Sequence, residues 1–285
     1  MIAELVAEVG PLWHERHQAG LASRPRCRAV GAGAKHKLVF VDRLLATLVH
    51  LRHGATHDVL ACWFGVDRST ITRAIGEVRP LLAMRGCTIA PGVRLRSLAE
   101  VVDYLGASGQ TGIIDGTEVR VRRPAVGRKD REKFISGKNK QNAVKFMVVT
   151  DAGGRLLFCS PAQPASCADI THARQLGLVR LLADGPVVEI LADAGYQGLG
   201  AQTGGQVVTP PHRKFRKDVP DWYEEMRKTH SSRRIRVEHG IAHLKNWRAL
   251  ARHHGRREHM TDTIQAIAGL LSHQQTIALA ADERM

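Results

Sequence analysis

Apolar positions along the chain repeat in two ways, and the change from one to the other falls near residue 110. Before this point the spacing is helical, and it predicts helices over residues 1–20, 41–53, 56–64 and 68–83. Residues 22–36 are rich in Arg, Gly and Ala and indicate a linker. From Leu38 to Leu82 the pattern is therefore helical throughout.

After Thr111 the apolar residues gather in short runs that are typical of strands. These runs predict strands within 111–121, 143–151, 155–162, 186–195 and 205–211. Helical patterns return over 169–184, from Ser232 onward, and over 261–280. The turn-rich passage between Leu82 and Thr111 carries neither pattern. This order predicts an α/β domain that follows a small all-helical domain. The predicted divisions are 1–35, 36–90 and 108–285.

The composition, 44% hydrophobic and 24% charged over 285 residues, is that of a soluble globular protein. No segment approaches the roughly 18 apolar residues of a membrane span, and the first residues carry acids where a signal peptide carries bases. We therefore expect a cytoplasmic protein with no membrane partner. The five cysteines are scattered and never spaced as Cys-x-x-Cys, which indicates neither a disulfide framework nor a zinc ribbon.

The net charge of +15 is concentrated in two windows of the chain. Residues 120–145 hold ten Lys and Arg against two acids, and residues 212–259 hold fourteen against six. The rest of the chain is almost neutral. Such clustering is typical of a surface that neutralises closely spaced phosphates, so a nucleic acid is the expected partner. Lys138 and Lys140, in the first window, are predicted to contact DNA.

The segment THDVLACWFGVDRSTITRAI has the pattern of a helix-turn-helix. Ala61 is small where two helices would cross, Gly65 permits the turn, and Ile71 would pack the second helix against the first. A helix starting after the N-cap Asp67 would present its first residues to the DNA major groove. The predicted DNA-binding residues are Arg68, Ser69, Thr70, Thr72 and Arg73. The alternative is a helical bundle that binds no ligand or serves only in dimerisation.

Three acids stand at positions where a carboxylate needs an explanation. Asp115 follows the apolar pair Ile113–Ile114, and Asp193 ends a later strand-like run. Glu238 lies among Arg, His and Lys, on one helical stripe with Arg234 and Lys245. Each aspartate could instead cap a turn or a helix, and Glu238 could simply pair with its basic neighbours. Together the three could form an oxygen site for Mg²⁺ or Mn²⁺, with two ions serving an in-line displacement at phosphorus.

These features resemble the DDE transposases of bacterial insertion sequences, in the branch related to Harbinger elements. The resemblance spans residues 38–275 and rests on the helix-turn-helix and on the motifs IIDGTEVRV, LADAGYQG and RRIRVEHGIAHLKNW. The acids of these motifs are separated by 78 and 45 residues. Arg234 and Lys245 match basic positions of the third motif, whereas Ser231 stands where the family has Tyr.

The resemblance implies a ribonuclease-H-like mixed sheet with flanking helices. It implies that Asp115, Asp193 and Glu238 are the catalytic and metal-binding triad, with Arg234 and Lys245 near DNA. The activity expected is cleavage and joining of DNA at the terminal repeats of an element and at its target. Since two ends must be brought together, we expect a homodimer, with residues 1–20 as one possible contact, in the nucleoid-containing cytoplasm.

The same residues allow other interpretations. An inactive relative that only regulates through DNA binding would keep the helix-turn-helix and the basic surface. A metal-dependent nuclease would cut DNA without joining it. An aspartyl phosphatase would need its nucleophile at Ile113, which excludes that class. His239 and His243 could bind zinc from one helical face, but no third ligand is evident nearby.

Overall fold

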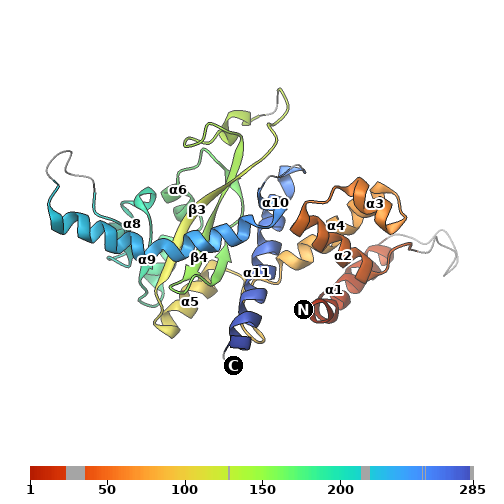
Figure 1. Ribbon diagram of the computed structural model, residues 1–285, viewed down its shortest axis with the longest axis horizontal. Helices are drawn as coiled ribbons and strands as arrows, with labels where there is room; N and C mark the ends of the chain where they lie inside the picture. Colours follow the sequence, from red (N-terminus) through yellow and green to blue (C-terminus); the bar gives the residue numbers. More distant parts are fainter. Residues whose placement is uncertain (24–35, 128, 213–218, 252, 254, 283–285) are drawn as a thin grey trace.

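The structure is a computed structural model that describes residues 1–23, 36–127, 129–212, 219–251, 253 and 255–282. An all-helical head lies beside a mixed sheet, and the two are joined through the carboxy-terminal helices (Figure 1). The head consists of α1 (Ile2–Ala22), α2 (Phe40–His53), α3 (His57–Phe64) and α4 (Arg68–Ala83). These bounds confirm the predicted helices, while most of the predicted linker lies outside the described residues.

One small core lies within the head, and α1 packs into the main core that it shares with α2, α4 and α11. Ile71 and Ala61 are buried between α3 and α4, and Gly65 ends α3 in the left-handed conformation at φ 60°. Both observations confirm the predicted helix-turn-helix packing. Leu5 and Val9 of α1 are fully buried within the chain, whereas Ile2 and Leu12 of the same helix are exposed. The dimer contact suggested for residues 1–20 remains a prediction.

The sheet contains both parallel and antiparallel pairs. Its strand order is β5-β4-β3-β7-β8, with β6 pairing to β4. The antiparallel part is built from β3, β4, β5 and β6, and the parallel part from β3, β7 and β8. Their bounds are Gly112–Arg120 (β3), Ala143–Asp151 (β4), Leu156–Cys159 (β5), Gln163–Pro164 (β6), Ile190–Leu191 (β7) and Val207–Val208 (β8).

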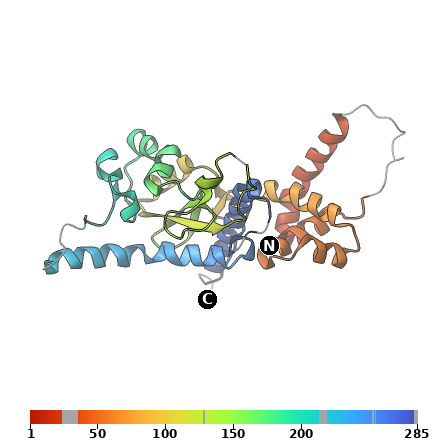
Figure 2. The ribbon, with the colours of Figure 1, turned by 90° about the horizontal axis from the view of Figure 1, so that it is seen from above.

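Helices cover both faces of this sheet (Figure 2). Ile113 packs into the same core as Val237 and Leu244 of α9, while its neighbour Ile114 belongs to a second core on the opposite face. This alternation follows from the pleat of a strand, which turns successive side chains to opposite faces. The remaining helices are α5 (Leu98–Ser108), α6 (Asp169–Gln175), α7 (Leu178–Asp184), α8 (Leu199–Gln202), α9 (Asp221–Lys245), α10 (Arg248–Ala251) and α11 (Met260–Asp282).

Two parts of the chain differ from the sequence prediction. The passage expected to be irregular contains the hairpin β1 (Cys87–Ala90) and β2 (Val93–Leu95), followed by α5. The start of α5 carries a capping box: Ser97 Oγ accepts a hydrogen bond from the Glu100 amide, and the Glu100 carboxylate accepts one from the Ser97 amide. This local helix signal was present in the sequence and was missed. Helix α9 begins at Asp221 rather than near Ser232. The proposed domain divisions themselves remain predictions.

Candidate active site

Asp115 lies within β3, and Asp193 lies just beyond the end of the neighbouring parallel strand β7. Ile113 of β3 is paired with Leu191 of β7, and each aspartate follows two residues later, so the register brings the two to equivalent positions. Because side chains two residues apart on a strand share a face, Asp115 faces the side that α9 covers, as Ile113 does. The sheet register thus accounts for two of the three predicted acids.

Asp115 is held in a partly buried position, with its side chain 19% exposed. One carboxylate oxygen, Oδ1, accepts a hydrogen bond from the Gly116 amide at 2.8 Å. Burial, together with the negative charges of Asp193 and Asp169, raises the pKa of Asp115 to about 6 against the opposing charge of Arg234. The ionised form is therefore disfavoured in the protein alone. A cation bound beside Asp115 would favour the ionised carboxylate and so oppose the effect of burial.

Helix α9 brings the basic residues of the third motif to Asp115. The Arg234 guanidinium nitrogen Nη2 is 3.7 Å from Asp115 Oδ2, and its side chain is only 11% exposed. Lys245 lies near Asp115 and Glu118, whose charges raise its pKa, although burial lowers it more. Both cations therefore flank the acids, as their place on one stripe predicted.

Glu238 lies on α9 between these two cations, one helical turn after Arg234. Its neighbour Val237 is fully buried against the sheet, which confirms the predicted apolar stripe of the helix. Glu238 itself is exposed, and its carboxylate makes no hydrogen bond or ion pair with any residue that the structure describes. The helix that covers Asp115 and Asp193 thus carries Glu238, but no contact joins the three acids. Its role remains a prediction.

A fourth carboxylate, Asp169 at the start of α6, was missed by the sequence reasoning. A β-carbon added to Gly195 would lie 3.0 Å from both Asp169 Oδ2 and Asp193 Oδ1, and one added to Gly116 would lie 2.3 Å from Asp169 Oδ1. Lys145 holds Asp169 in place, with Nζ 3.2 Å from Oδ1. An acid in the first turn of a helix is a common dipole-stabilising feature, so the sequence alone gave no reason to single it out.

The two predicted lysines of the first basic window lie on the turn that precedes β4. Ser136 Oγ accepts hydrogen bonds from the Lys138 and Asn139 amides and donates one to Glu118. Lys140 has a left-handed backbone, at φ 52°. The turn is therefore fixed to β3 through Glu118, three residues beyond Asp115, and both lysine side chains are exposed to solvent.

In the head, α4 begins at Arg68 as predicted. Asp67 stands at the N-cap position, although its side chain makes no capping hydrogen bond. Of the five predicted contact residues, Thr70 is half-buried and the others are exposed. Arg68 lies 3.5 Å from Asp58, and Thr72 Oγ1 is 2.9 Å from His57 Nδ1. The first turns of α4 thus present an open polar surface.

Comparison with known proteins identifies the family. The model of the DDE superfamily endonuclease matches residues 114–272, and the model of the helix-turn-helix of that superfamily matches residues 36–88. The chain belongs to the DDE superfamily endonucleases. A relative from Streptomyces albus G, described as "Putative transposase for insertion sequence element IS112", is 30% identical over 224 residues, which are 78% of this chain and 75% of the relative.

Similarity to solved structures is weaker. The Mos1 transposase paired-end complex with left transposon end shares 12% identity at a TM-score of 0.22, covering 85% of this chain and 84% of that one. The mariner Mos1 paired-end complex with Mg shares 14% identity at a TM-score of 0.19, covering 82% and 86%. The assignment of this chain to the DDE endonucleases rests on the family models and on the relative from Streptomyces albus G, and not on these superpositions.

Enzymes of the DDE superfamily use divalent metal ions, and the residues of this chain can be tested for that fit. Within the described ranges no three His, Cys, Asp or Glu side chains are grouped closely enough to hold a metal, which also leaves His239 and His243 without a third ligand. Asp115 and Asp193 nevertheless fit a hard cation, because they supply carboxylate oxygens and crowd negative charge in a partly buried place. A site completed by Glu238 is therefore a proposal.

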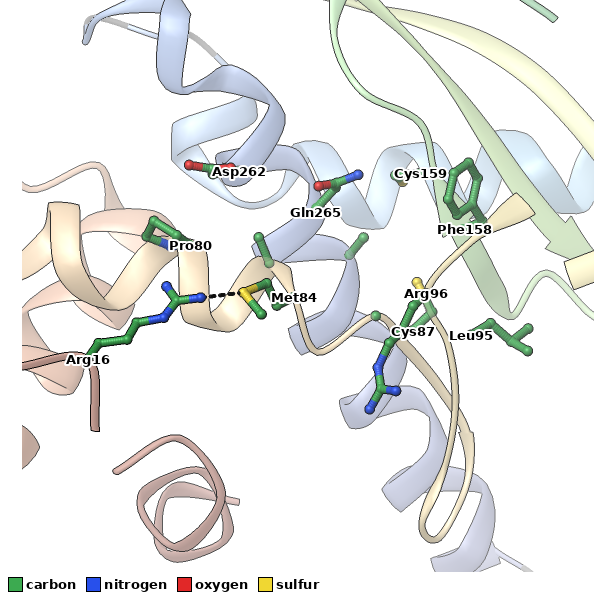
Figure 3. Close-up of a pocket in the computed structure, with 13 residues that line it drawn as sticks. Arg16, Pro80, Met84, Cys87, Leu95, Arg96, Phe158, Cys159, Asp262 and Gln265 are labelled. Atoms are coloured by element: carbon green, nitrogen blue, oxygen red, sulfur yellow. Dashed lines mark hydrogen bonds between the residues drawn. The ribbon is translucent and has the colours of Figure 1, made fainter. Parts of the chain in front are cut away.

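One hollow lies at the junction of α4, β1 and α11 (Figure 3). Its volume is about 440 Å³, and buried Cys87 and Cys159 line it beside Met84, whose sulfur accepts a hydrogen bond from Arg16. None of the predicted site residues of this DDE endonuclease lines it.

No helix in the described part of the chain is long and apolar enough to cross a membrane.

Proposed function

We propose that this DDE endonuclease is a transposase that binds the terminal repeats of its element and cleaves and joins DNA strands. The observation that carries the proposal is the placement of Asp115 within β3 and of Asp193 just after the neighbouring parallel strand β7, beneath a basic helix that carries Glu238. Acids on adjacent parallel strands, among cations, suit a reaction at a phosphodiester, whose oxygens need both a metal and positive side chains.

Asp115, Asp193 and Glu238 would hold the divalent ions, Mg²⁺ or Mn²⁺, and two ions are expected. When bound, the ions would supply activation of the attacking water or 3′-hydroxyl and stabilisation of the leaving oxygen. Glu238 is exposed and without a partner among the described residues, so its side chain is free to turn toward the two aspartates. The carboxylates must be ionised to bind the metal, and Arg234 favours that form of Asp115.

The cations of this chain would orient the DNA around these acids. Arg234 and Lys245 flank Asp115 and would contact the phosphates next to the bond that is cut. Lys138 and Lys140 extend the positive surface along the turn that Ser136 fixes. In the head, Arg68, Ser69, Thr70, Thr72 and Arg73 would read the terminal repeat from the first turns of α4.

Transposition joins two element ends to one target, so a homodimer with one end bound to each copy is the simplest assembly. Because the chain acts on chromosomal DNA, its proposed place is the nucleoid-containing cytoplasm. Target DNA would approach the same acids after cleavage, since the 3′-hydroxyl produced there is the nucleophile of the joining step.

The decisive experiment uses the DNA ends that flank the gene, labelled on each strand and incubated with the full chain and Mg²⁺. Nicking and joining are scored separately. Glu238→Gln keeps size and helix propensity while removing the charge that a divalent ion requires, so cleavage and joining should both collapse while DNA affinity and thermal stability persist. Glu225→Gln, an exposed position on the same helix, is the matched control and should remain active.

The alternatives predict different products. A regulator without chemistry would bind the ends and cut neither strand in the wild-type chain. A nuclease without strand transfer would nick and never join. Normal cleavage by Glu238→Gln would show that Glu238 is not part of the site and is simply a solvent-exposed residue of α9.

A further inference from the structure

Two hollows adjoin where the head meets the sheet. The first, of about 350 Å³, is lined by the end of β3 and the start of β4 and includes Arg120, Arg122 and Lys140. The second, of about 430 Å³, lies between the end of α2 and α10 and includes His50 and Arg248. His253 lines both hollows, so they lie next to each other, and we call the two together the junction trough.

The junction trough is strongly positive. Its first hollow is lined by the four cations Arg120, Arg122, Arg123 and Lys140, and none of its lining residues, or of those of the second hollow, is an acid. Arg123 pairs with Glu132 at 3.4 Å, but the other three cations form no ion pair with a described residue. Cations that converge on a hollow without acidic partners repel one another, and a polyanion relieves this repulsion.

At one end the trough reaches the recognition helix of the head. The rings of His50 and His57 are in edge contact, with centroids 5.1 Å apart. His57 Nδ1 lies 2.9 Å from the hydroxyl of Thr72, on the exposed side of α4. The second hollow therefore begins beside the residues that are predicted to read DNA.

The other end of the trough lies on the strand that carries Asp115. Arg120 ends β3, and Asp115 stands five residues earlier on the same strand, about 17 Å away at the rise of a β-strand. That length corresponds to about five base-pair steps of a duplex. A DNA backbone that leaves the first hollow along β3 would thus meet Lys138 and then the acids within half a helical turn.

The spacing between the two ends is fixed by close contacts at the junction. A β-carbon on Gly54, after α2, would lie 3.1 Å from Arg248 Cβ, and Arg52 stacks over the Trp247 ring at 5.3 Å. On the other side, the His253 amide donates to the Arg120 carbonyl at 3.1 Å. In Figure 1, α10 stands between the head and the sheet, which is where these contacts gather. The head is therefore held at a set distance from the acids.

We propose that the junction trough binds the sugar–phosphate backbone of duplex DNA between the sequence recognised by α4 and the bond that is cut. Arg120, Arg122 and Arg248 hold phosphates there, and the fixed junction sets the distance from the recognised sequence to the cleaved bond. This inference rests on the proposed function, because it assigns the path of the same DNA between two of its contacts.

The test compares wild-type chain with the triple variant Arg120→Gln, Arg122→Gln and Arg248→Gln on labelled DNA from the flanks of the gene. Hydroxyl-radical footprinting reads which backbone positions are protected, and fluorescence anisotropy across NaCl concentrations gives the slope of log affinity against log salt. The matched control is Arg180→Gln, an exposed arginine of α7 that lines neither hollow. Thermal melting verifies that each variant is folded.

The triple variant should lose protection only between the recognised sequence and the cut, while protection of the recognised sequence persists. Its salt slope should fall by up to about 2.7, since each lost phosphate contact removes about 0.9. An unchanged footprint and slope would overturn the junction trough while wild-type cleavage still upholds the proposed function. An equal fall per charge with Arg180→Gln would overturn it as well, because charge at any position would then suffice. Absence of cleavage by the wild-type chain would instead defeat the proposed function.

Discussion

Replacing Asp115 with Asn tests whether this acid is held under electrostatic strain. In the folded chain its pKa is about 6, raised from an ordinary 3.8 chiefly by burial. A difference of about two pKa units corresponds to about 3 kcal/mol by which folding disfavours the ionised form at neutral pH. Asn has the size of Asp, keeps an oxygen for the Gly116 amide and carries no charge. Asp115→Asn should therefore raise the free energy of unfolding by up to about 3 kcal/mol in metal-free buffer.

The gain should depend on pH in a defined direction. Because the folded-state pKa of Asp115 lies above the unfolded value, the folded chain binds more protons between these two values, and wild-type stability falls as pH rises from about 4 to about 6. Asn has no such titration. The difference between variant and wild type should be near zero at pH 3.5, grow through this window and stay constant above about pH 7.

The assay is urea unfolding of both chains at several pH values. The measurement at pH 7.5 is repeated with and without about 10 mM Mg²⁺. Bound Mg²⁺ should stabilise the wild type and abolish the advantage of the variant. Asp184→Asn, an exposed acid that pairs with Arg180 on the surface, should change stability by less than about 0.5 kcal/mol. Lower stability of Asp115→Asn at pH 7.5, or an equal gain at pH 3.5, would refute the argument from burial.

Two further substitutions probe the recognition helix and the fourth carboxylate. Arg73→Ala should weaken binding to the element ends by about 1–3 kcal/mol and binding to random DNA by less, as competition titrations would measure; equal losses would mean that the helix contributes only charge. Gly116→Ala should cost about 1–3 kcal/mol in urea unfolding, because its β-carbon would meet Asp169 Oδ1 at 2.3 Å. In the Gly116→Ala chain, a second substitution Asp169→Asn should not restore stability, since the oxygen that obstructs the β-carbon remains. Asp169→Ala removes that oxygen and should restore it.

The sequence by itself determined the parts whose physics is local. Helical spacing of apolar residues marked α2, α3 and α4 almost to the residue, and short apolar runs marked β3 and β4. Gly65 indicated the turn of the head, because glycine readily adopts the left-handed conformation found there. Ile71 indicated the packing, because an apolar residue at that spacing is expected to be buried. The concentration of charge indicated a polyanionic partner in the same way.

Elements with weak or short signals were not determined locally. Strand β7 has only two paired residues, and it is a strand because β3 and β8 lie on either side of it. The hairpin before α5 was missed because its few residues pack against distant elements, with Thr88 donating its amide to Ser272 of α11. Such pairings depend on residues far along the chain, which a window of sequence does not contain.

The candidate site shows the same division. Asp115 and Asp193 could be chosen from the sequence, since an acid at the end of an apolar run is costly unless it binds something. Their register on adjacent strands, the presence of Asp169 beside Gly195, and the hold of Arg234 on Asp115 required the tertiary structure. The sequence determines which side chains can carry charge, whereas the fold alone decides which charges are buried together, because burial and separation set their energies.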